Sequence, residues 1–244
     1  MSDQPTIILV HGAWHGAWCW DDVAEALRGQ GFEVLVPDLP GHETYGSSAR
    51  IWDRLGSYVS HVDSLVQGVQ GEVVVVGHSM GGLVTQRMLE KRTVRHGILV
   101  ASVPRKGAGG AVARLAKHDA SQLVEATKSL SLYPLVDSDD RVRGHFFKEG
   151  ANPSAVKAAG AKIQNESLLA FLSLIVRWPQ PSKVSTPMTV VGATQDGIFT
   201  LPEQRDLAQA YGTELIEIDS GHDIMLEPQY TELVDIIVER ANAT

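Results

Sequence analysis

The feature that most constrains this chain is a serine between two glycines, placed directly after a run of four valines. The run Val73–Val76 is typical of a strand buried on both faces of a parallel sheet, and Gly77-His78-Ser79-Met80-Gly81 follows it. Residues 83–90 then carry apolar side chains at helical spacing. This is the strand-turn-helix context of a G-x-S-x-G elbow, in which the serine has strained backbone angles. We therefore expect the hydroxyl of Ser79 to stand free at the edge of a sheet.

Short β-branched runs alternate with helical segments along the chain, which indicates parallel strands joined by crossover helices. The expected strands are residues 6–10, 33–36, 73–76, 97–100, 188–191 and 214–218. Helices are expected at residues 20–28, 51–69 and about 228–240. Residues 104–186 are rich in helical pattern and contain no convincing strand. We predict one α/β domain over residues 1–244, with a mostly parallel sheet flanked by helices and a helical cap at 104–186 inserted before the penultimate strand.

Composition excludes several classes of protein. The net charge of −8 leaves no basic stripe for nucleic acid or for an anionic membrane surface. The longest apolar runs are too short to span a bilayer, and the N-terminus lacks the basic and apolar regions of a signal peptide. The single cysteine, Cys19, excludes an internal disulfide and is expected to be a small buried hydrophobe. We therefore expect a cytoplasmic protein with no nucleic-acid or membrane partner.

Two further side chains complete a candidate hydrolytic site. His222 follows the last expected strand and Asp196 follows the penultimate one, so both should lie at the sheet edge that carries Ser79. A nucleophilic serine needs a histidine as general base, and that histidine needs a carboxylate to fix its tautomer. Asp196 could instead cap the helix that follows it. Asp38 and Asp219 are weaker candidates for the acid, because Asp38 has the context of a turn and Asp219 is too close to His222 in the chain.

Acyl transfer also needs two N–H donors for the developing oxyanion. The N–H of Met80 follows the nucleophile directly, and the N–H of Ala13 lies in the loop after the first strand, where Gly12 permits a turn. We expect His11 to be structural. For His15 two roles stay open, support of this loop or contact with substrate. Apolar residues of the insertion either pack it onto the sheet or line a pocket, and the pocket candidates are Trp14, His15, Phe146, Phe171, Leu172 and Ile175.

Over essentially its whole length the chain resembles the α/β-hydrolase superfamily. The resemblance is carried by His11-Gly12, Asp38-Leu39-Pro40-Gly41-His42, the elbow pentapeptide, Asp196 and His222. The order of serine, acid and histidine along the chain is the one that this fold uses. Residues 11–18 and 222–228 are similar to the group that contains plant methylesterases and hydroxynitrile lyases.

Two positions separate the branches of that group. In the lyases a threonine follows the first histidine and a lysine follows the catalytic histidine, whereas this chain has Gly12 and Asp223. The glycine matches the esterase branch, which has an apolar residue at the second position, so Asp223 departs from both branches. A carboxylate beside His222 is expected to repel anionic substrates.

These residues together predict a carboxylic-ester hydrolase that acts on a small, largely apolar ester and needs no cofactor or metal. In the superfamily that the chain resembles, haloalkane dehalogenases and epoxide hydrolases carry an aspartate at the position of Ser79. The serine therefore disfavours dehalogenation and epoxide hydrolysis for this chain. In the predicted mechanism Ser79 attacks the ester carbonyl and forms an acyl-enzyme, while His222, held by Asp196, moves the proton. The alternatives are a lyase, a lactonase, a thioesterase, or a small-molecule receptor with slow turnover.

Overall fold

The centre of the molecule is a six-stranded sheet in which every neighbouring pair of strands is parallel. The computed structural model describes residues 4–42, 53–118 and 120–243. The order of the strands across the sheet is β2-β1-β3-β4-β5-β6. Their bounds are β1 (Thr6–Val10), β2 (Val34–Leu35), β3 (Val73–His78), β4 (His96–Val100), β5 (Met188–Ala193) and β6 (Leu215–Ile218). The expected mostly parallel sheet is confirmed, with β2 shorter than predicted.

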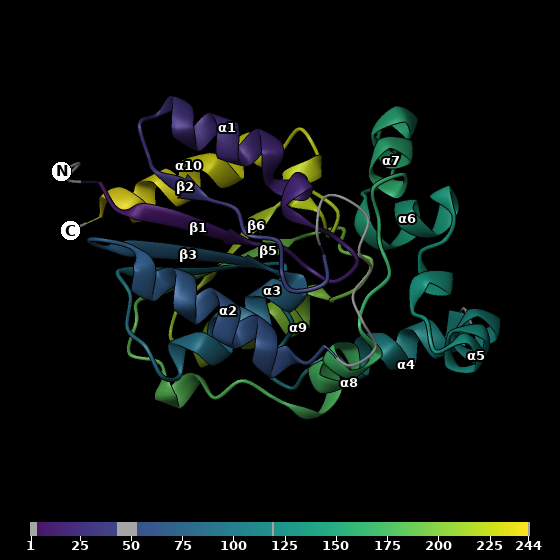
Figure 1. Ribbon diagram of the computed structural model, residues 1–244. Helices are drawn as coiled ribbons and strands as arrows, with labels where there is room; N and C mark the ends of the chain where they lie inside the picture. Colours follow the sequence, from purple (N-terminus) through teal and green to yellow (C-terminus); the bar gives the residue numbers. More distant parts are fainter. Residues whose placement is uncertain (1–3, 43–52, 119, 244) are drawn as a thin grey trace.

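Helices cover both faces of this sheet, as Figure 1 shows, and alternate side chains of each strand point to opposite faces. On β1, Ile7 and Leu9 pack in the core with α1 (Asp21–Gly29) and α10 (Tyr230–Asn242). Ile8 and Val10 belong to the core on the other face. That face is covered by α2 (Leu55–Gly68), α3 (Ser79–Leu89) and α9 (Leu201–Ala210). The valine run of β3 is fully buried because both faces are covered.

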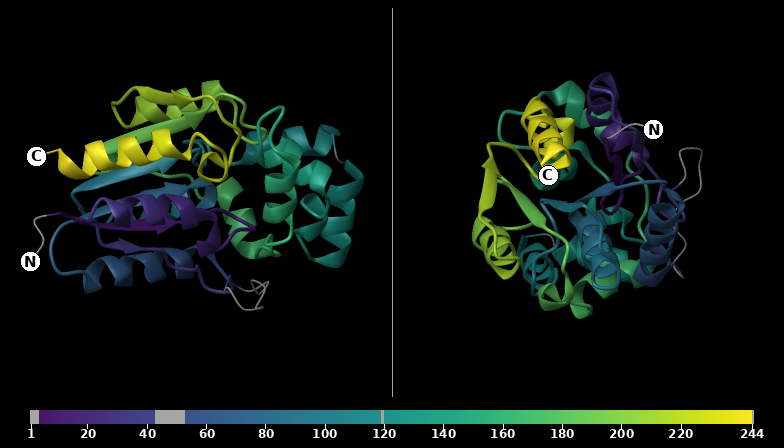
Figure 2. Two further views of the ribbon diagram at one scale, coloured as in Figure 1. Left: turned by 90° about the horizontal axis from the view of Figure 1, so that it is seen from above. Right: turned by 90° about the vertical axis from the view of Figure 1, so that its left-hand side faces the viewer.

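The segment between β4 and β5 is helical and lies beyond the carboxyl ends of the strands, while both termini lie at the opposite end of the sheet (Figures 1 and 2). Its helices are α4 (Gly109–His118), α5 (Ala120–Ser129), α6 (Asp139–Phe146), α7 (Pro153–Gly160) and α8 (Leu168–Val176). Short 3-10 turns are η1 (Ala17–Trp20), η2 (Tyr133–Leu135), η3 (Pro181–Lys183) and η4 (Ile224–Leu226). Assignment of residues 104–186 as a cap on a single domain stays our prediction.

The turn from β3 into α3 has the tight geometry that the G-x-S-x-G pattern predicts. Ser79 has a φ of +51°, in the left-handed region that L-residues rarely adopt. A side chain on Gly81 would collide with the carbonyl oxygens of Val10 and His11, and one on Gly77 would collide with the Gly81 backbone. Glycine at both positions therefore lets β1, β3 and α3 meet closely around the serine.

Three further expectations from the sequence concern the helix at residues 51–69, the burial of Cys19 and the lack of a membrane span. The helix expected from residue 51 begins at Leu55, and residues 51 and 52 lie outside the described part of the chain. Cys19 is buried at 1% exposure, and burial raises the pKa of its thiol well above the usual value. Among the described residues, no helix combines the length and apolar character needed to cross a membrane.

Candidate active site

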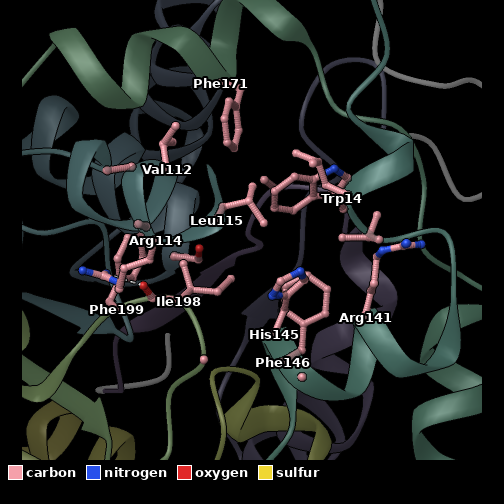
Figure 3. Close-up of a pocket in the computed structure, with 18 of the residues that line it drawn as sticks. Trp14, Val112, Arg114, Leu115, Arg141, His145, Phe146, Phe171, Ile198 and Phe199 are labelled. Atoms are coloured by element: carbon pink, nitrogen blue, oxygen red, sulfur yellow. Dashed lines mark hydrogen bonds between the residues drawn. The ribbon is translucent and has the colours of Figure 1, made fainter. Parts of the chain in front are cut away.

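Ser79 lines a pocket of about 570 Å³ at the carboxyl ends of the strands. The pocket is bounded by the loop after β1, by α4, α6 and α8, and by the loop after β5 (Figure 3). Ser79 begins α3, so its position is fixed by the start of a helix and by the end of the central strand β3. The sharp turn thus presents the serine to the pocket rather than to the core.

The structure brings His222 and Asp196 together. His222 Nδ1 lies 2.9 Å from Asp196 Oδ2, and both side chains are only 1% exposed. The other oxygen of Asp196 accepts the N–H groups of Ile198 (2.7 Å) and Phe199 (2.8 Å). Because a carboxylate only accepts, His222 Nδ1 carries a proton and donates it. His222 Nε2 is buried and has no hydrogen-bond partner among the described residues.

Asp196 does not cap α9, the alternative left open by its sequence position. Thr200 is the N-cap of that helix, and Glu203 completes a capping box by accepting the Thr200 N–H at 2.8 Å. The carboxylate of Asp196 therefore bonds its own loop and His222, and it also accepts the side-chain amide of Gln204 from α9 at 3.4 Å.

Glu227 fixes the loop that carries His222, a role that sequence analysis missed. Its buried carboxylate accepts the Ser220 hydroxyl at 3.0 Å and the Gly221 N–H at 3.3 Å. It also accepts the N–H of Lys148 at 2.6 Å, which connects the loop to the segment after α6. The sequence signal for this role is an acidic residue within an otherwise apolar stretch, Met225-Leu226-Glu227-Pro228.

The loop after β1 lies against the elbow, since a Cβ on Gly12 would lie 3.0 Å from the Ser79 Cβ, and Ala13 and Ser79 line the same pocket. Among the described residues, the N–H groups of Ala13 and Met80 donate no backbone hydrogen bond outside the regular helices and strands. Trp14 has a φ of +63°, which turns the loop sharply beside Ala13. His11 Nδ1 donates to the Gly12 carbonyl (2.8 Å), and His11 Nε2 accepts the Leu39 N–H (2.9 Å). Burial lowers the pKa of His11 well below its usual value, so His11 is a neutral structural residue, as expected.

His15 and Asp223 form a second buried pair and do not line the pocket. His15 Nε2 lies 2.9 Å from Asp223 Oδ2, and His15 Nδ1 lies 2.7 Å from the Ala13 carbonyl oxygen. The inclusion of His15 in the substrate pocket is therefore wrong, because both ring nitrogens are used inside the protein. Asp223 is fully buried and faces His15, which removes the basis for the expected repulsion of anionic substrates.

The pocket wall is mainly apolar and aromatic. Trp14, Phe146 and Phe171 line it, and Figure 3 shows these rings around one common space. Leu172 does not line it, since its side chain is 45% exposed, and Ile175 is also absent from the wall. The reason is helical periodicity, because α8 presents residues 171 and 174 to the pocket and turns residue 172 outward.

Sequence analysis missed several pocket residues. Val112 and Leu115 come from α4 at a spacing of three, which is a detectable helical signal, and Phe199 follows Asp196 in the same loop. Two arginines also reach the wall. Arg114 pairs with Glu203 at 2.8 Å, and Arg141 pairs with Asp137, so both cations have carboxylate partners within the protein.

A buried carboxylate joins the segment before α8 to the core of the sheet domain. Glu166 is 1% exposed and lies 3.0 Å from His42 Nε2, while the Tyr58 hydroxyl donates to its other oxygen at 3.0 Å. Burial opposes the charge on His42, yet the Glu166 carboxylate raises the pKa of His42 above its usual value. These residues hold α8, and with it Phe171, against the core.

The described residues also contain one cluster with ligand atoms close enough for a metal ion. Atoms of His78, His222 and Asp223 lie within 4.8 Å of one another, and all three residues are buried. His78 Nε2 already donates to the His222 carbonyl at 3.1 Å, and His222 Nδ1 is bonded to Asp196. The cluster is therefore organised by protein hydrogen bonds.

The chain belongs to the α/β hydrolase family, since the model of that family matches residues 7–236. It is similar to a carbendazim hydrolyzing esterase of Nocardioides sp. (strain SG-4G), with 40% identity over 81 residues, or 32% of each chain. It is also similar to methyl jasmonate esterase 1 of Vitis vinifera, with 37% identity over 89 residues, 34% of this chain and 33% of the relative. These matches thus span about a third of the relatives' length.

Solved structures agree with the fold over nearly the whole chain. An extracellular α/β-hydrolase from a Paenibacillus species superposes with a TM-score of 0.78 at 19% identity, covering 98% of this chain and 100% of that one. A methylesterase from Arabidopsis superposes with a TM-score of 0.72 at 20% identity, covering 96% and 98%. At these identities the likeness establishes the α/β-hydrolase fold.

Proposed function

We propose that this protein is a serine-dependent carboxylic-ester hydrolase. The observation that carries the proposal is the state of His222, whose Nδ1 is held by Asp196 at 2.9 Å while its Nε2 has no hydrogen-bond partner among the described residues. A histidine oriented at one nitrogen and free at the other is the arrangement that a general base needs.

In the proposed mechanism Ser79 Oγ attacks the carbonyl carbon of the ester and its proton passes to His222 Nε2. The resulting imidazolium is stabilised by the Asp196 carboxylate, and the oxyanion accepts the N–H groups of Ala13 and Met80. His222 then gives its proton to the departing alcohol, which leaves an acyl group on Ser79. Water, deprotonated by His222, releases the acid by the reverse sequence.

Ser79 and His222 make no direct hydrogen bond in the structure. Such bonds are often long or absent without substrate and tighten when the reacting groups are in place. The ring of His222 packs against Phe199 at 5.6 Å between centroids and against His78 at 4.8 Å, so its plane is held by neighbours.

The pocket supports an apolar substrate of moderate size. Its volume of about 570 Å³ lies within the range of small-molecule sites, and Trp14, Phe146, Phe171 and Phe199 supply aromatic walls. The esterase names of the curated relatives favour the same reaction class. We expect esters with bulky apolar groups to be hydrolysed faster than acetates.

Gly12 argues against lyase chemistry of the related branch. A Cβ at this position would lie 3.0 Å from the Ser79 Cβ and 2.9 Å from His78 Nδ1, so a threonine could enter only if the elbow shifted. Asp223 is buried behind the site and offers no cation to a substrate. Both features favour acyl transfer at Ser79.

The test is a panel of p-nitrophenyl esters, lactones and thioesters, run with the wild-type protein and with Ser79→Ala. We expect ester hydrolysis, and a decrease of roughly 10⁴-fold to 10⁶-fold in kcat for Ser79→Ala. A fluorophosphonate probe should label Ser79 and should fail to label the alanine variant. Labelling at another residue, or an alanine variant of normal activity, would refute the proposal.

A further inference from the structure

The second buried pair, His15 and Asp223, has a hydrogen-bond pattern that determines where its protons lie. His15 Nδ1 faces the carbonyl oxygen of Ala13 at 2.7 Å, and His15 Nε2 faces the carboxylate of Asp223 at 2.9 Å. A carbonyl oxygen only accepts, so Nδ1 must carry a proton. A second proton lies between Nε2 and Oδ2, and it belongs on the imidazole because a carboxylic acid is the stronger acid. His15 is therefore an imidazolium and Asp223 a carboxylate.

The surroundings agree with this charge state. Burial disfavours both charges, yet Asp223 raises the pKa of His15 above its usual value, and His15 in turn holds the pKa of Asp223 below its usual value. The other titratable groups that act on His15 are histidines. His78 donates its Nε2–H to the His222 carbonyl, and burial followed by the nearby His222 lowers the pKa of His78 well below its usual value. His42 opposes the charge on His15 from the loop after β2.

This pair connects the two loops that the proposed reaction needs. Asp223 is the residue after His222, and its N–H donates to the Phe146 carbonyl at 2.9 Å, which fixes its backbone. His15 holds the carbonyl of Ala13, whose N–H is the proposed oxyanion donor, at the point where Trp14 has a φ of +63°. Stacking on Trp18 at 5.3 Å and an edge contact with Phe146 at 5.1 Å immobilise the His15 ring.

We propose that Asp223 is a positioning residue for the oxyanion site: it holds His15 as an imidazolium, and His15 fixes the Ala13 carbonyl beside the strained backbone of Trp14. The inference rests on the proposed function, because it assigns the Ala13 N–H to the oxyanion. The hydrogen bond of the Asp223 side chain goes to His15, and its other oxygen lies 3.5 Å from His78 Nε2. Without Asp223, a buried imidazole has no counter-charge and no partner for Nε2, and the bond to the Ala13 carbonyl weakens.

The protonation state is tested by NMR on the protein labelled with ¹⁵N-histidine, with the His15 signals identified by their loss in His15→Gln. We expect both ring nitrogens of His15 to carry protons at neutral pH in the wild type. In Asp223→Asn the amide can donate to Nε2, so we expect a neutral ring that keeps its Nδ1 proton. A neutral His15 ring in the wild type at neutral pH would overturn the inference.

The positioning role is tested by the kinetics of Asp223→Leu, in which the side chain keeps its branched shape but has no polar atom. We expect kcat to fall about 10²-fold, as for loss of an oxyanion donor, with KM changed by less than about threefold. Inhibition by a trifluoromethyl ketone, whose adduct mimics the oxyanion, should weaken by the same factor. Asp223→Asn should keep kcat within about tenfold of wild type, since Nδ1–H of His15 still reaches the Ala13 carbonyl.

Asp219→Asn is the matched control, because Asp219 lies in the same loop with a side chain 69% exposed, and it should leave kcat unchanged. A folded Asp223→Leu with normal kcat, or a loss confined to KM, would overturn the inference. If Asp223→Leu does not fold, either of two results would overturn the inference: a neutral His15 ring in the wild type, or a fall in kcat well beyond about tenfold in an Asp223→Asn that keeps its Nδ1 proton. An active Ser79→Ala would refute the proposed function, whereas an inactive Ser79→Ala beside a fully active Asp223→Leu would refute this inference alone.

Discussion

Two histidine–carboxylate pairs lie side by side in this molecule and are built for different tasks. His222 pairs with Asp196, and His15 pairs with Asp223, the residue next to His222; both contacts are 2.9 Å and both pairs are buried. The difference is at the second ring nitrogen. In His15 it is bonded to a backbone carbonyl, whereas in His222 it has no partner among the described residues. The first arrangement holds a proton in place, and the second leaves a nitrogen that can take and return one.

The two carboxylates differ in a corresponding way. Asp196 accepts two backbone N–H groups through one oxygen, so its position does not depend on the charge of His222. Asp223 has one oxygen with no hydrogen-bond partner among the described side chains and backbone, and its charge depends on His15. The pairing of a histidine with an acid is therefore no sufficient sign of catalysis. The hydrogen-bond state of the second ring nitrogen distinguishes the two cases.

The largest expected effect comes from a substitution that breaks the pair of His222 and Asp196. Asp196→Asn should fold normally but lower kcat by about 10⁴-fold, because His222 then loses both its correct tautomer and the stabilisation of its imidazolium. In steady-state kinetics the double variant with His222→Ala should be scarcely slower than His222→Ala alone, since residues that act as one unit are not additive.

The same experiment exposes a wrong assignment of the acid. If Asp196→Asn turned over at a near-normal rate while Asp219→Asn or Asp223→Asn collapsed, the acid role would move to that residue. Thermal unfolding of each variant separates a loss of chemistry from a loss of fold. The geometry favours Asp196, because Asp219 is exposed and bonded to Thr194 and Gln195.

The next largest effect is on the free energy of unfolding, and it comes from breaking the pair of His15 and Asp223. Although burial opposes it, Asp223 raises the pKa of His15 above 6.5, so the stability that this charge contributes is present below that pH and is lost as the pH rises through the raised value. The lowered pKa of Asp223 means that its contribution is lost only as the pH falls through that lowered value. In Asp223→Leu the buried His15 must stay neutral, so protonation then destabilises the fold.

We therefore expect the free energy of unfolding of Asp223→Leu to fall below that of the wild type by about 3 kcal/mol near pH ~5.5, and by clearly less near pH ~8.5. Urea denaturation at both pH values measures the two differences. The titration of His11 is common to both proteins and largely cancels. Loss of Asp223 lowers the pKa of the buried His78 further, which adds to the difference in the same direction. A difference that is equal at the two pH values, or larger at the higher one, would contradict a charged His15.

The sequence predicts the sheet and the order of site residues well because both follow from local patterns. Continuous β-branched runs mark strands buried on both faces, and the elbow glycines mark a close approach that only glycine permits. Asp196 and His222 were placed at one sheet edge because each follows a parallel strand, and the structure brings them within hydrogen-bond distance. Their catalytic roles stay predictions.

What the sequence did not predict depends on contacts between distant segments. Which face of α8 meets the pocket is set by how that helix packs on the core, so Leu172 could not be separated from Leu174 by type alone. The partner of Asp223 lies 208 positions away in the chain, and no local pattern signals such a pair. Glu166 is another example, since its partners come from the loop after β2 and from α2.

The smallest expected effect comes from substituting Phe146, whose ring contacts the histidine of each pair. The ring of Phe146 lies 5.1 Å from His15 and 6.1 Å from His222, and it also lines the pocket. Phe146→Leu should therefore loosen both histidines, lowering kcat by about tenfold and the free energy of unfolding by about 1 kcal/mol. Phe171→Leu is the matched comparison, because Phe171 lines the same pocket and packs on Trp14 at 5.5 Å.

For Phe171→Leu we expect a rise in KM for bulky aromatic esters of roughly threefold to tenfold with kcat nearly unchanged, since only uniform binding of the substrate is weakened. The two leucine variants remove the same atoms, and both rings contact Trp14, at 6.2 Å for Phe146 and 5.5 Å for Phe171. A difference between their kcat values therefore reports on the contacts with His15 and His222 that Phe146 makes. Equal losses of kcat in both would show that Phe146 acts on the substrate alone. A loss of kcat in Phe146→Leu alone would show that the ring of Phe146 holds both histidines in place, His222 with its free nitrogen and His15 with its bonded ring.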